Sequence, residues 1–406
     1  MSEIVEARPE QVGLSSDRLR HIRPWMERYV AERKLPGTLT VVARRGRAVY
    51  AEWVGRMDVE REKPIADDTI FRIYSMTKPI TSAAIMMLYE EGRFQLDDPI
   101  ARYLPMFKEM RVYAGGTAER YETVPATRPI TFKQLLTHTS GLTYGFTGTP
   151  VSAIYQAAKF DFQAEEASLP VMAERLAKLP LLAQPGSEWN YSVATDVLGA
   201  LIEIISGMPF HRFLEDRVFV PLGMSDTGFF VPEEKRDRFA ANYQRGEDGG
   251  FTLIDDTASS RYLTLRHPCS GGGGLVSTAA DYLRFCKMLA GQGESGGVRL
   301  LGRKTVEFMM MNHLAGDMAA MGMPRFSESS FDGVGFGLGG SVVIDPAKTQ
   351  LLRSRGEFAW GGAASTAFWI DPEEDLIAIF MTQLMPSSSY PIRAELRVLV
   401  NQALID

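Results

Sequence analysis

The chain has 406 residues, of which 45% are hydrophobic and 23% are charged, values close to those of an average soluble globular protein. This composition excludes a disordered regulator, a fibrous protein and a disulfide-rich miniprotein. The formal net charge is −6, from 44 Lys+Arg and 50 Asp+Glu. Because no basic field surrounds the chain, we expect neither a nucleic-acid nor a membrane partner, and a homo-oligomer is left open.

The N-terminus has no basic segment followed by an apolar stretch, so the sequence predicts no signal peptide. We therefore expect a cytoplasmic protein, although a mature chain whose leader had been removed would look the same. The sequence contains no run of about 18 apolar residues, so it predicts no transmembrane helix. Cys269 and Cys286 are too few for a disulfide framework or a cysteine-based zinc site. We expect two free thiols, with a single bridge as the alternative.

The N-terminal part of the chain predicts a helix, a hairpin and a second helix. Residues 15–35 have apolar side chains about one turn apart after a capping serine (Ser15 or Ser16), and Pro24 is expected to kink this helix. The β-prone runs 38–43 and 48–54 flank Arg44-Arg45-Gly46-Arg47, a hairpin signature. A third run, 69–74, ends at Ser75, and a helix is predicted over 76–91.

Strands return only near the C-terminus. Residues 92–330 are typical of helices and long loops, with helices predicted over 194–206 and 281–289. Strands are then predicted over 337–344, 365–370 and 376–382, followed by an amphipathic helix over 392–405. We predict an α+β fold in which both termini build one antiparallel sheet flanked by helices. Residues 1–91 and 331–406 would form this α/β domain, 92–330 a mostly helical inserted domain, and the cleft between them a ligand site.

Three short segments could carry chemistry. Ser75-Met76-Thr77-Lys78 places a hydroxyl and an amine on one face of a helix start, where a desolvated lysine could activate the serine. Tyr191, in a loop before the 194–206 helix, could act as a base beside a lysine. Trp360-Gly361-Gly362-Ala363 could bring a backbone amide close to a ligand. The alternatives are a capping serine with a solvated lysine, a packed loop aromatic and a β-bulge.

Together, in this order, the three segments resemble family VIII carboxylesterases, within the superfamily of class C β-lactamases and penicillin-binding DD-peptidases. Residues 135–142 (Leu-Leu-Thr-His-Thr-Ser-Gly-Leu) and 271–278 extend the resemblance over nearly the whole chain. It implies a serine esterase without metal or organic cofactor. Ser75 would be the nucleophile, Lys78 and Tyr191 the coupled base, and the backbone amides of Ser75 and Ala363 the oxyanion hole.

The resemblance also implies which residues contact the substrate. Trp360, Gly361 and Gly362 would form the third motif, and Tyr144 would line the cleft unless it is an ordinary loop aromatic. The sequence departs from the β-lactamase pattern at two places: Val193 stands where an asparagine is usual, and Trp360-Gly361-Gly362 replaces Lys-Thr-Gly. Since a cation and an amide for binding a β-lactam are missing, the sequence favours neutral esters.

Other motifs are interpreted as structural. Ser295 lies in Gly-x-Ser-x-Gly, but a helix precedes it and a surface hairpin is predicted there, unlike a nucleophile elbow. Gly271–Gly274 lacks the ending of a phosphate loop, and the five histidines lack metal-ligand spacing, with His138 expected to form structural hydrogen bonds.

The predicted function is therefore hydrolysis of short-chain carboxylic esters, with a small-molecule ester as the partner. Acyl transfer, β-lactam hydrolysis and D-amino-acid peptide cleavage are the alternatives that keep the same residues. A non-catalytic binding protein on this scaffold is the alternative from another class.

Overall fold

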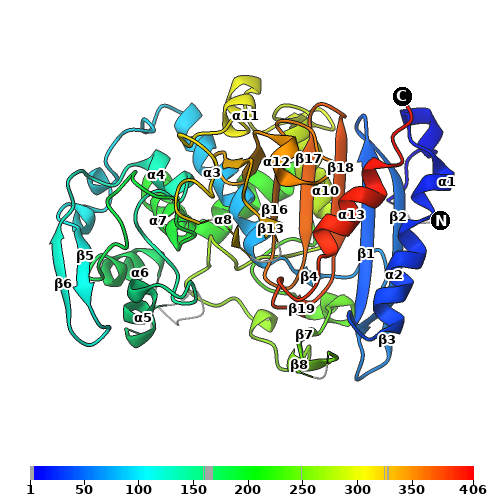
Figure 1. The fold of residues 1–406 in the computed structure, drawn as a ribbon, viewed down its shortest axis with the longest axis horizontal. Helices are drawn as coiled ribbons and strands as arrows, with labels where there is room; N and C mark the ends of the chain where they lie inside the picture. The colour runs from blue at the N-terminus through cyan, green and yellow to red at the C-terminus, as the bar shows by residue number, and fades with distance from the viewer. Residues whose placement is uncertain (1–3, 159, 161–167, 248, 324, 327–328) are drawn as a thin grey trace.

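The computed structural model describes residues 4–158, 160, 168–247, 249–323, 325–326 and 329–406. Its centre is an antiparallel sheet of eight strands in the order β14-β15-β16-β17-β18-β1-β2-β3 (Figure 1). The strands are β14 (Val334–Phe336), β15 (Ser341–Val343), β16 (Phe358–Gly361), β17 (Ala367–Asp371), β18 (Leu376–Met381), β1 (Gly37–Arg44), β2 (Arg47–Asp58) and β3 (Lys63–Pro64). Strand β1 pairs with β18, from Leu39 opposite Met381 to Arg44 opposite Leu376. The predicted sheet built from both termini is confirmed.

Both faces of this sheet are covered. Every residue of β1 and of β18 is buried. Along β1, Leu39, Val41 and Ala43 belong to the larger hydrophobic core, whereas Val42 belongs to a second core on the opposite face. Because successive side chains of a strand point to opposite faces, an unbroken apolar run requires helices on both sides of the sheet.

Helices from distant parts of the chain supply this cover. On the face at the right of Figure 1 lie α1 (Ser16–Leu19), α2 (Ile22–Ala31) and α13 (Ile392–Asn401), and on the other face lie α3 (Thr77–Glu90) and α10 (Ala279–Ala290). One continuous helix over 15–35 was wrong, since the chain turns between α1 and α2. Pro24 falls in the first turn of α2, where it removes no helical hydrogen bond. Ser15 does cap α1, accepting a hydrogen bond from Arg18 N at 3.3 Å.

Two strand predictions need correction. The strand predicted over 337–344 contains β15 but begins too early, because its first half is the turn between β14 and β15, where Gly339 has a φ of 106° that favours glycine. Strand β16 was missed. In the predicted strand over 69–74, only Phe71–Arg72 (β4) is extended. It pairs with Val276–Ser277 (β9) outside the main sheet.

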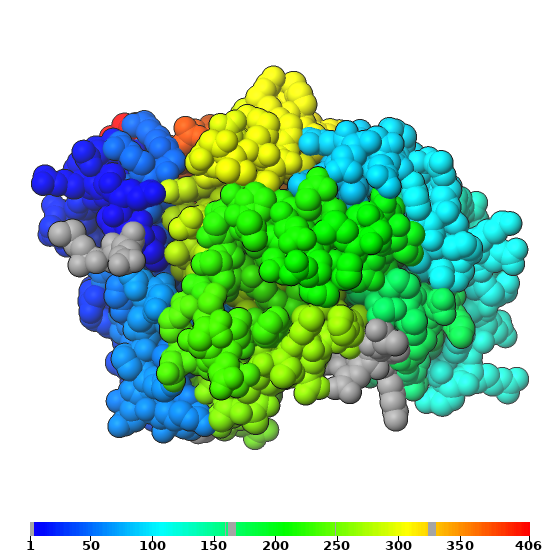
Figure 2. Space-filling model, turned by 180° about the vertical axis from the view of Figure 1, so that it is seen from behind, coloured from blue at the N-terminus to red at the C-terminus, as the bar shows by residue number. Residues whose placement is uncertain are grey.

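The middle of the chain is mostly helical, with short hairpins. Its other helices are α4 (Phe132–Leu136), α5 (Pro150–Ala157), α6 (Leu169–Leu176), α7 (Ala194–Ser206), α8 (Phe210–Leu214), α9 (Val220–Leu222) and α11 (Arg303–Met309), and α12 (Pro346–Thr349) follows β15. The small strands are β5 (Arg111–Gly116), β6 (Tyr121–Pro125), β7 (Asn242–Arg245), β8 (Phe251–Asp255), β10 (Glu294–Ser295), β11 (Val298–Arg299), β12 (Arg325–Phe326), β13 (Ser329–Ser330) and β19 (Leu384–Met385). Middle-chain residues, green and yellow, fill the centre of the face in Figure 2.

The boundaries of an inserted domain at residues 92 and 330 stay a prediction. Helix α10 comes from this middle segment but packs against β18 of the main sheet. Within the described ranges, no single helix is long and apolar enough to cross a membrane. One pair, Ala194–Ser206 with Phe210–Leu222, meets that length and composition only when counted together, and it bends by 83°.

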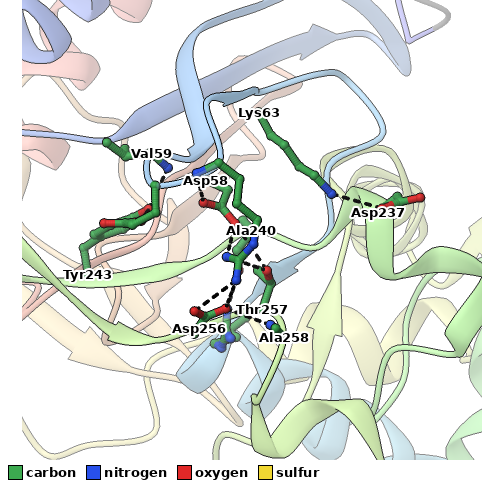
Figure 3. Close-up of polar contacts among 12 residues, drawn as sticks. Asp58, Val59, Lys63, Asp237, Ala240, Tyr243, Asp256, Thr257 and Ala258 are labelled. Atoms are coloured by element: carbon green, nitrogen blue, oxygen red, sulfur yellow. Dashed lines mark hydrogen bonds and ion pairs between the residues drawn. The ribbon is translucent and has the colours of Figure 1, made fainter.

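A polar network fastens the β2–β3 edge of the sheet to residues 237–258 (Figure 3). The fully buried carboxylate of Asp58 accepts hydrogen bonds from the side chains of Arg61, at 2.8 Å, and Thr257, at 3.3 Å. Arg61 also pairs with Asp256 at 2.8 Å. Since the buried charge of Asp58 is matched by a cation and a hydroxyl, this edge is fixed relative to the middle segment.

Cys269 and Cys286 are buried free thiols, as expected from the sequence. Burial raises the pKa of the Cys269 thiol to about 12 and that of Cys286 well above its usual range. Because the thiolate is the reactive form, we predict that Ellman's reagent at pH 8 labels neither cysteine in the folded protein and both after unfolding in guanidinium without reductant. Rapid labelling of the folded protein would contradict this burial, and absence of labelling after unfolding would indicate a bridge.

Candidate active site

The candidate nucleophile stands on a tight turn. Tyr74–Met76 form one turn of 3₁₀ helix immediately before α3, and Tyr74 has a φ of 42°, a strained value for a tyrosine. The backbone amide of Ile73 donates to Leu275 O at 3.1 Å and that of Met76 donates to Ile73 O at 3.0 Å, so the turn is held from two sides. Ser75 is thereby presented at the start of α3, with Lys78 in the first turn of the same helix.

Lys78 is almost completely buried, with 1% of its surface exposed. Its Nζ donates to three oxygens: Ser75 Oγ at 3.2 Å, Tyr144 OH at 3.0 Å and Gly272 O at 2.7 Å. An ammonium group has three hydrogens to donate, so every one of them finds an acceptor. The interpretation of Lys78 as a solvated surface lysine is therefore wrong.

Tyr191 completes the group. Its hydroxyl donates to Ser75 Oγ at 2.6 Å, and its ring lies beneath Lys78, with Nζ 4.6 Å from the ring centroid. The ring packs against Trp189 at 6.3 Å and His138 at 5.2 Å between centroids. Tyr191 is therefore both a packed loop aromatic and the candidate base, because its packing in the loop before α7 directs its hydroxyl toward Ser75.

His138 serves this packing. It is buried, and its Nδ1 lies 3.0 Å from Ser192 Oγ. Burial, with a smaller contribution from the charge of Lys78, holds the pKa of His138 well below its usual value. The imidazole is therefore neutral at physiological pH, in keeping with the structural role expected from the sequence.

Tyr144 and Asp196 form a second layer around Lys78. Burial, then the charge of Asp196 and the neighbouring Tyr191, raise the pKa of Tyr144 well above 10, so its phenol keeps its proton. Asp196 Oδ1 accepts from Ser270 Oγ at 2.6 Å and from Gly272 N at 3.1 Å. Burial raises the pKa of Asp196, while the bond from Ser270 and the charge of Lys78 oppose this. The carboxyl group thus fixes residue Gly272, whose carbonyl oxygen accepts a hydrogen bond from Lys78.

The third motif meets the serine turn at the end of β16. A Cβ at Gly362 would lie 2.4 Å from Ile73 O and 2.3 Å from Thr366 Oγ1, so only glycine allows this approach. The next backbone amide, that of Ala363, lines the cleft and makes no hydrogen bond with any residue that the structure describes. It is free to donate to a ligand oxygen beside Ser75.

A cleft of about 670 Å³ opens over these groups. Trp360 forms an aromatic wall, with its ring 5.5 Å from that of Tyr191 and 5.3 Å from that of Phe336. Phe146, which stacks on Tyr144 at 4.8 Å, lines the mouth. The cleft therefore offers several aromatic side chains to a substrate near Ser75.

Sequence reasoning missed several residues of the cleft. Three arginines (Arg353, Arg393 and Arg397) line one end, so this end does carry cations although the motif lysine is absent. Arg393 donates to Gly362 O at 3.2 Å and Thr366 O at 3.0 Å. The hydrogen bond from Lys78 to Gly272 O and the hydrogen bond by which Asp196 holds Gly272 were also unforeseen, and only the glycine run at 271–274 signalled a close backbone approach.

The remaining motifs lie elsewhere. Ser295 ends β10, which forms a two-strand hairpin with β11. The surface hairpin predicted there is confirmed. Within the described parts of the chain, no group of three or more His, Cys, Asp or Glu side chains could hold a metal ion.

Comparison with known proteins identifies the family. The β-lactamase family model matches residues 22–402. Protein Rv1367c of Mycobacterium tuberculosis is 39% identical over 362 residues, 87% of each chain, and Esterase EstB of Burkholderia gladioli is 31% identical over 370 residues, 86% of each. The solved structure of EstCE1, described as a hydrolase with promiscuous acyltransferase activity, has a TM-score of 0.79 at 28% identity and covers 95% of this chain and 98% of its own. The chain belongs to the β-lactamase family, and its resemblance to that superfamily is confirmed.

The close contact at Gly362 yields a prediction. Gly362→Ala should lower the rate of ester hydrolysis at least about 100-fold, because a methyl group would push the end of β16 away from the serine turn and misplace the Ala363 amide. Gly228→Ala is the matched control, since its Cβ would meet nothing closer than 3.7 Å. The measurement is hydrolysis of p-nitrophenyl butyrate by each folded variant. Equal rates for both variants would show that the approach of Gly362 to the turn is dispensable.

Proposed function

We propose that the protein is a family VIII carboxylesterase that hydrolyses short-chain carboxylic esters through an acyl-enzyme on Ser75. The observation that carries this proposal is the position of Ser75 Oγ, 2.6 Å from Tyr191 OH and 3.2 Å from Lys78 Nζ on the floor of an aromatic cleft. A serine hydroxyl becomes a useful nucleophile only when a neighbouring base accepts its proton. The Lys78/Tyr191 pair is the base within reach.

In the proposed reaction, Ser75 Oγ forms a bond to the ester carbonyl carbon while its proton moves to the Tyr191/Lys78 pair. To accept this proton, the reactive state must hold one proton fewer than the fully protonated trio of Ser75, Lys78 and Tyr191. The carbonyl oxygen becomes an oxyanion held by the amides of Ser75 and Ala363. The alcohol then leaves with the proton, and water releases the acid by the same route.

The aromatic wall favours esters over β-lactams. Trp360 stands at the position of the usual lysine and packs against Tyr191, so it offers an apolar surface to the substrate. Arg393 lies behind Gly361, where a Cβ would come within 2.5 Å of its guanidinium. We therefore expect Trp360, Gly361 and Gly362 to contact the uncharged parts of the ester near the reacting bond.

Acyl transfer is the second candidate, and it uses the same acyl-enzyme with an alcohol in place of water. The exposed Phe146 and the buried Phe331 both line the cleft, and their apolar surface would help a large alcohol to displace water. EstCE1 has such an activity by its description. Adding an alcohol acceptor to the esterase assay and measuring the new ester against the free acid would rank the two outcomes.

The proposal predicts which hydroxyl matters. Ser75→Ala should lower kcat/KM for p-nitrophenyl butyrate at least about 1000-fold, and Ser295→Ala should leave it nearly unchanged. Tyr191→Phe should lower the acylation rate about 100-fold or more with little effect on substrate binding, because it removes only proton transfer.

Three results would contradict the proposal. Loss of activity in folded Ser295→Ala would mean that the nucleophile is wrong. Failure of a fluorophosphonate probe to label Ser75 would favour a non-catalytic binding protein. Faster turnover of nitrocefin than of p-nitrophenyl butyrate would instead favour a β-lactamase.

A further inference from the structure

A second cavity of about 350 Å³ adjoins the cleft. The two cavities share Tyr74, Gly273 and Met385 as lining residues. Tyr74 directly precedes Ser75 in the chain, so this second cavity lies next to the nucleophile turn, and Trp360 lines only the main cleft. An ester bound at Ser75 with a long enough arm could extend past Met385, whose unbranched side chain adapts readily to a ligand.

The second cavity contains a cation without a partner. Arg261 is half-buried, lines this cavity, and makes no hydrogen bond or ion pair with any part of the chain that the structure describes. Arg393 in the main cleft differs, since it donates to two backbone carbonyls. A guanidinium offers five N–H donors in a planar fork that matches a carboxylate. Because Arg261 is partly removed from water and has no acceptor among the described residues, it favours an anionic ligand.

The amide of Asn242 lines the same cavity and holds two of its lining residues. Asn242 is 1% exposed, and its Nδ2 donates to Tyr74 OH at 2.9 Å and to Met385 Sδ at 3.4 Å. Its Oδ1 accepts no hydrogen bond from a described residue, but this atom is itself fully buried and therefore out of reach of a ligand. The charge of Arg261 is thus what favours an anion in this cavity.

The other charged groups around the cavity are compatible with an anion. Asp255 lines it, but its Oδ2 accepts from the fully buried Arg72 at 2.7 Å and from Ser260 Oγ at 3.2 Å. Its negative charge is therefore compensated within the protein. Arg266, which is mostly exposed, adds a second positive charge to the lining.

We propose that this second cavity binds a remote carboxylate of the substrate, so that the preferred esters are monoesters of dicarboxylic acids, with the free carboxylate on Arg261 and the ester carbonyl at Ser75. This proposal rests on the proposed esterase function. It identifies Arg261 as a specificity residue and restricts the substrate class to acids with a second, charged end.

The test compares two series of p-nitrophenyl esters of matched chain length: monoesters of succinate, adipate and suberate, and neutral esters of the corresponding monocarboxylic acids. In the native protein, the ratio of kcat/KM for charged over neutral esters should rise with chain length to a maximum. Arg261→Met should lower that maximal ratio about tenfold or more, as expected for loss of a charged hydrogen bond, and Arg261→Lys should restore part of it. Arg284→Met is the control, because Arg284 is exposed on α10 and lines neither cavity.

A binding measurement separates this proposal from the esterase function. Adipate itself should bind the Ser75→Ala variant by isothermal titration calorimetry, and the additional change Arg261→Met should weaken the Kd about tenfold. No advantage of charged over neutral esters at any length, or an unchanged ratio and Kd in Arg261→Met, would overturn the carboxylate site. If the protein hydrolyses no ester but still binds adipate in a way that depends on Arg261, only the esterase function would be overturned.

Discussion

A lysine ammonium held out of water is the constraint on which the rest of the site depends. Moving a charged group into a protein interior costs several kcal/mol unless hydrogen bonds replace its water. Lys78 has three such replacements, from a hydroxyl, a phenol and a backbone carbonyl. One of the three acceptors is the candidate nucleophile, Ser75. The hydrogen bonds that stabilise the buried lysine therefore also place its charge beside the Ser75 hydroxyl.

The acceptors come from segments far apart in sequence, and the fold explains why they meet. The sheet is built from both termini, so β16 ends against the turn that follows β4. Helix α7 packs on α3, and this contact brings Tyr191, in the loop just before α7, to Ser75. Asp196, in the first turn of α7, accepts a hydrogen bond from the Gly272 N–H. The loop and the helix that follows it thus carry the phenol and also position a ligand of the lysine.

Much of this could be predicted from the sequence. The spacing of Ser75 and Lys78 is local, so a helix start suffices to place both on one face, and the sheet followed from β-prone runs at both ends. The Tyr191 prediction depended on a family resemblance, because nothing local joins it to Ser75. The strand predicted over 337–344 contains β15 but begins four residues too early, because periodicity does not reveal where glycines turn the chain.

Tertiary contacts set the limit of such predictions. Gly272 acts through its carbonyl oxygen, which no side-chain pattern reveals. Arg261 is one of many arginines, and its distinction is that it lines a cavity and makes no hydrogen bond or ion pair with any described residue. Neither property is encoded in the spacing of neighbouring residues, since each depends on where segments separated by more than 180 residues come to lie.

The crystal structure of the protein after reaction with a p-nitrophenyl alkylphosphonate is the most direct measurement, since the phosphonyl group imitates the tetrahedral state of ester hydrolysis. We expect phosphorus bonded to Ser75 Oγ and one phosphonyl oxygen accepting a hydrogen bond from the Ala363 amide. Tyr191 OH and Lys78 Nζ should both remain within hydrogen-bonding distance of Oγ or of the leaving-group position. Phosphorus on another residue, or a Ser75 adduct whose oxygens point away from Ala363 and whose Oγ has lost both neighbours, would contradict the central claim that these groups act as one unit.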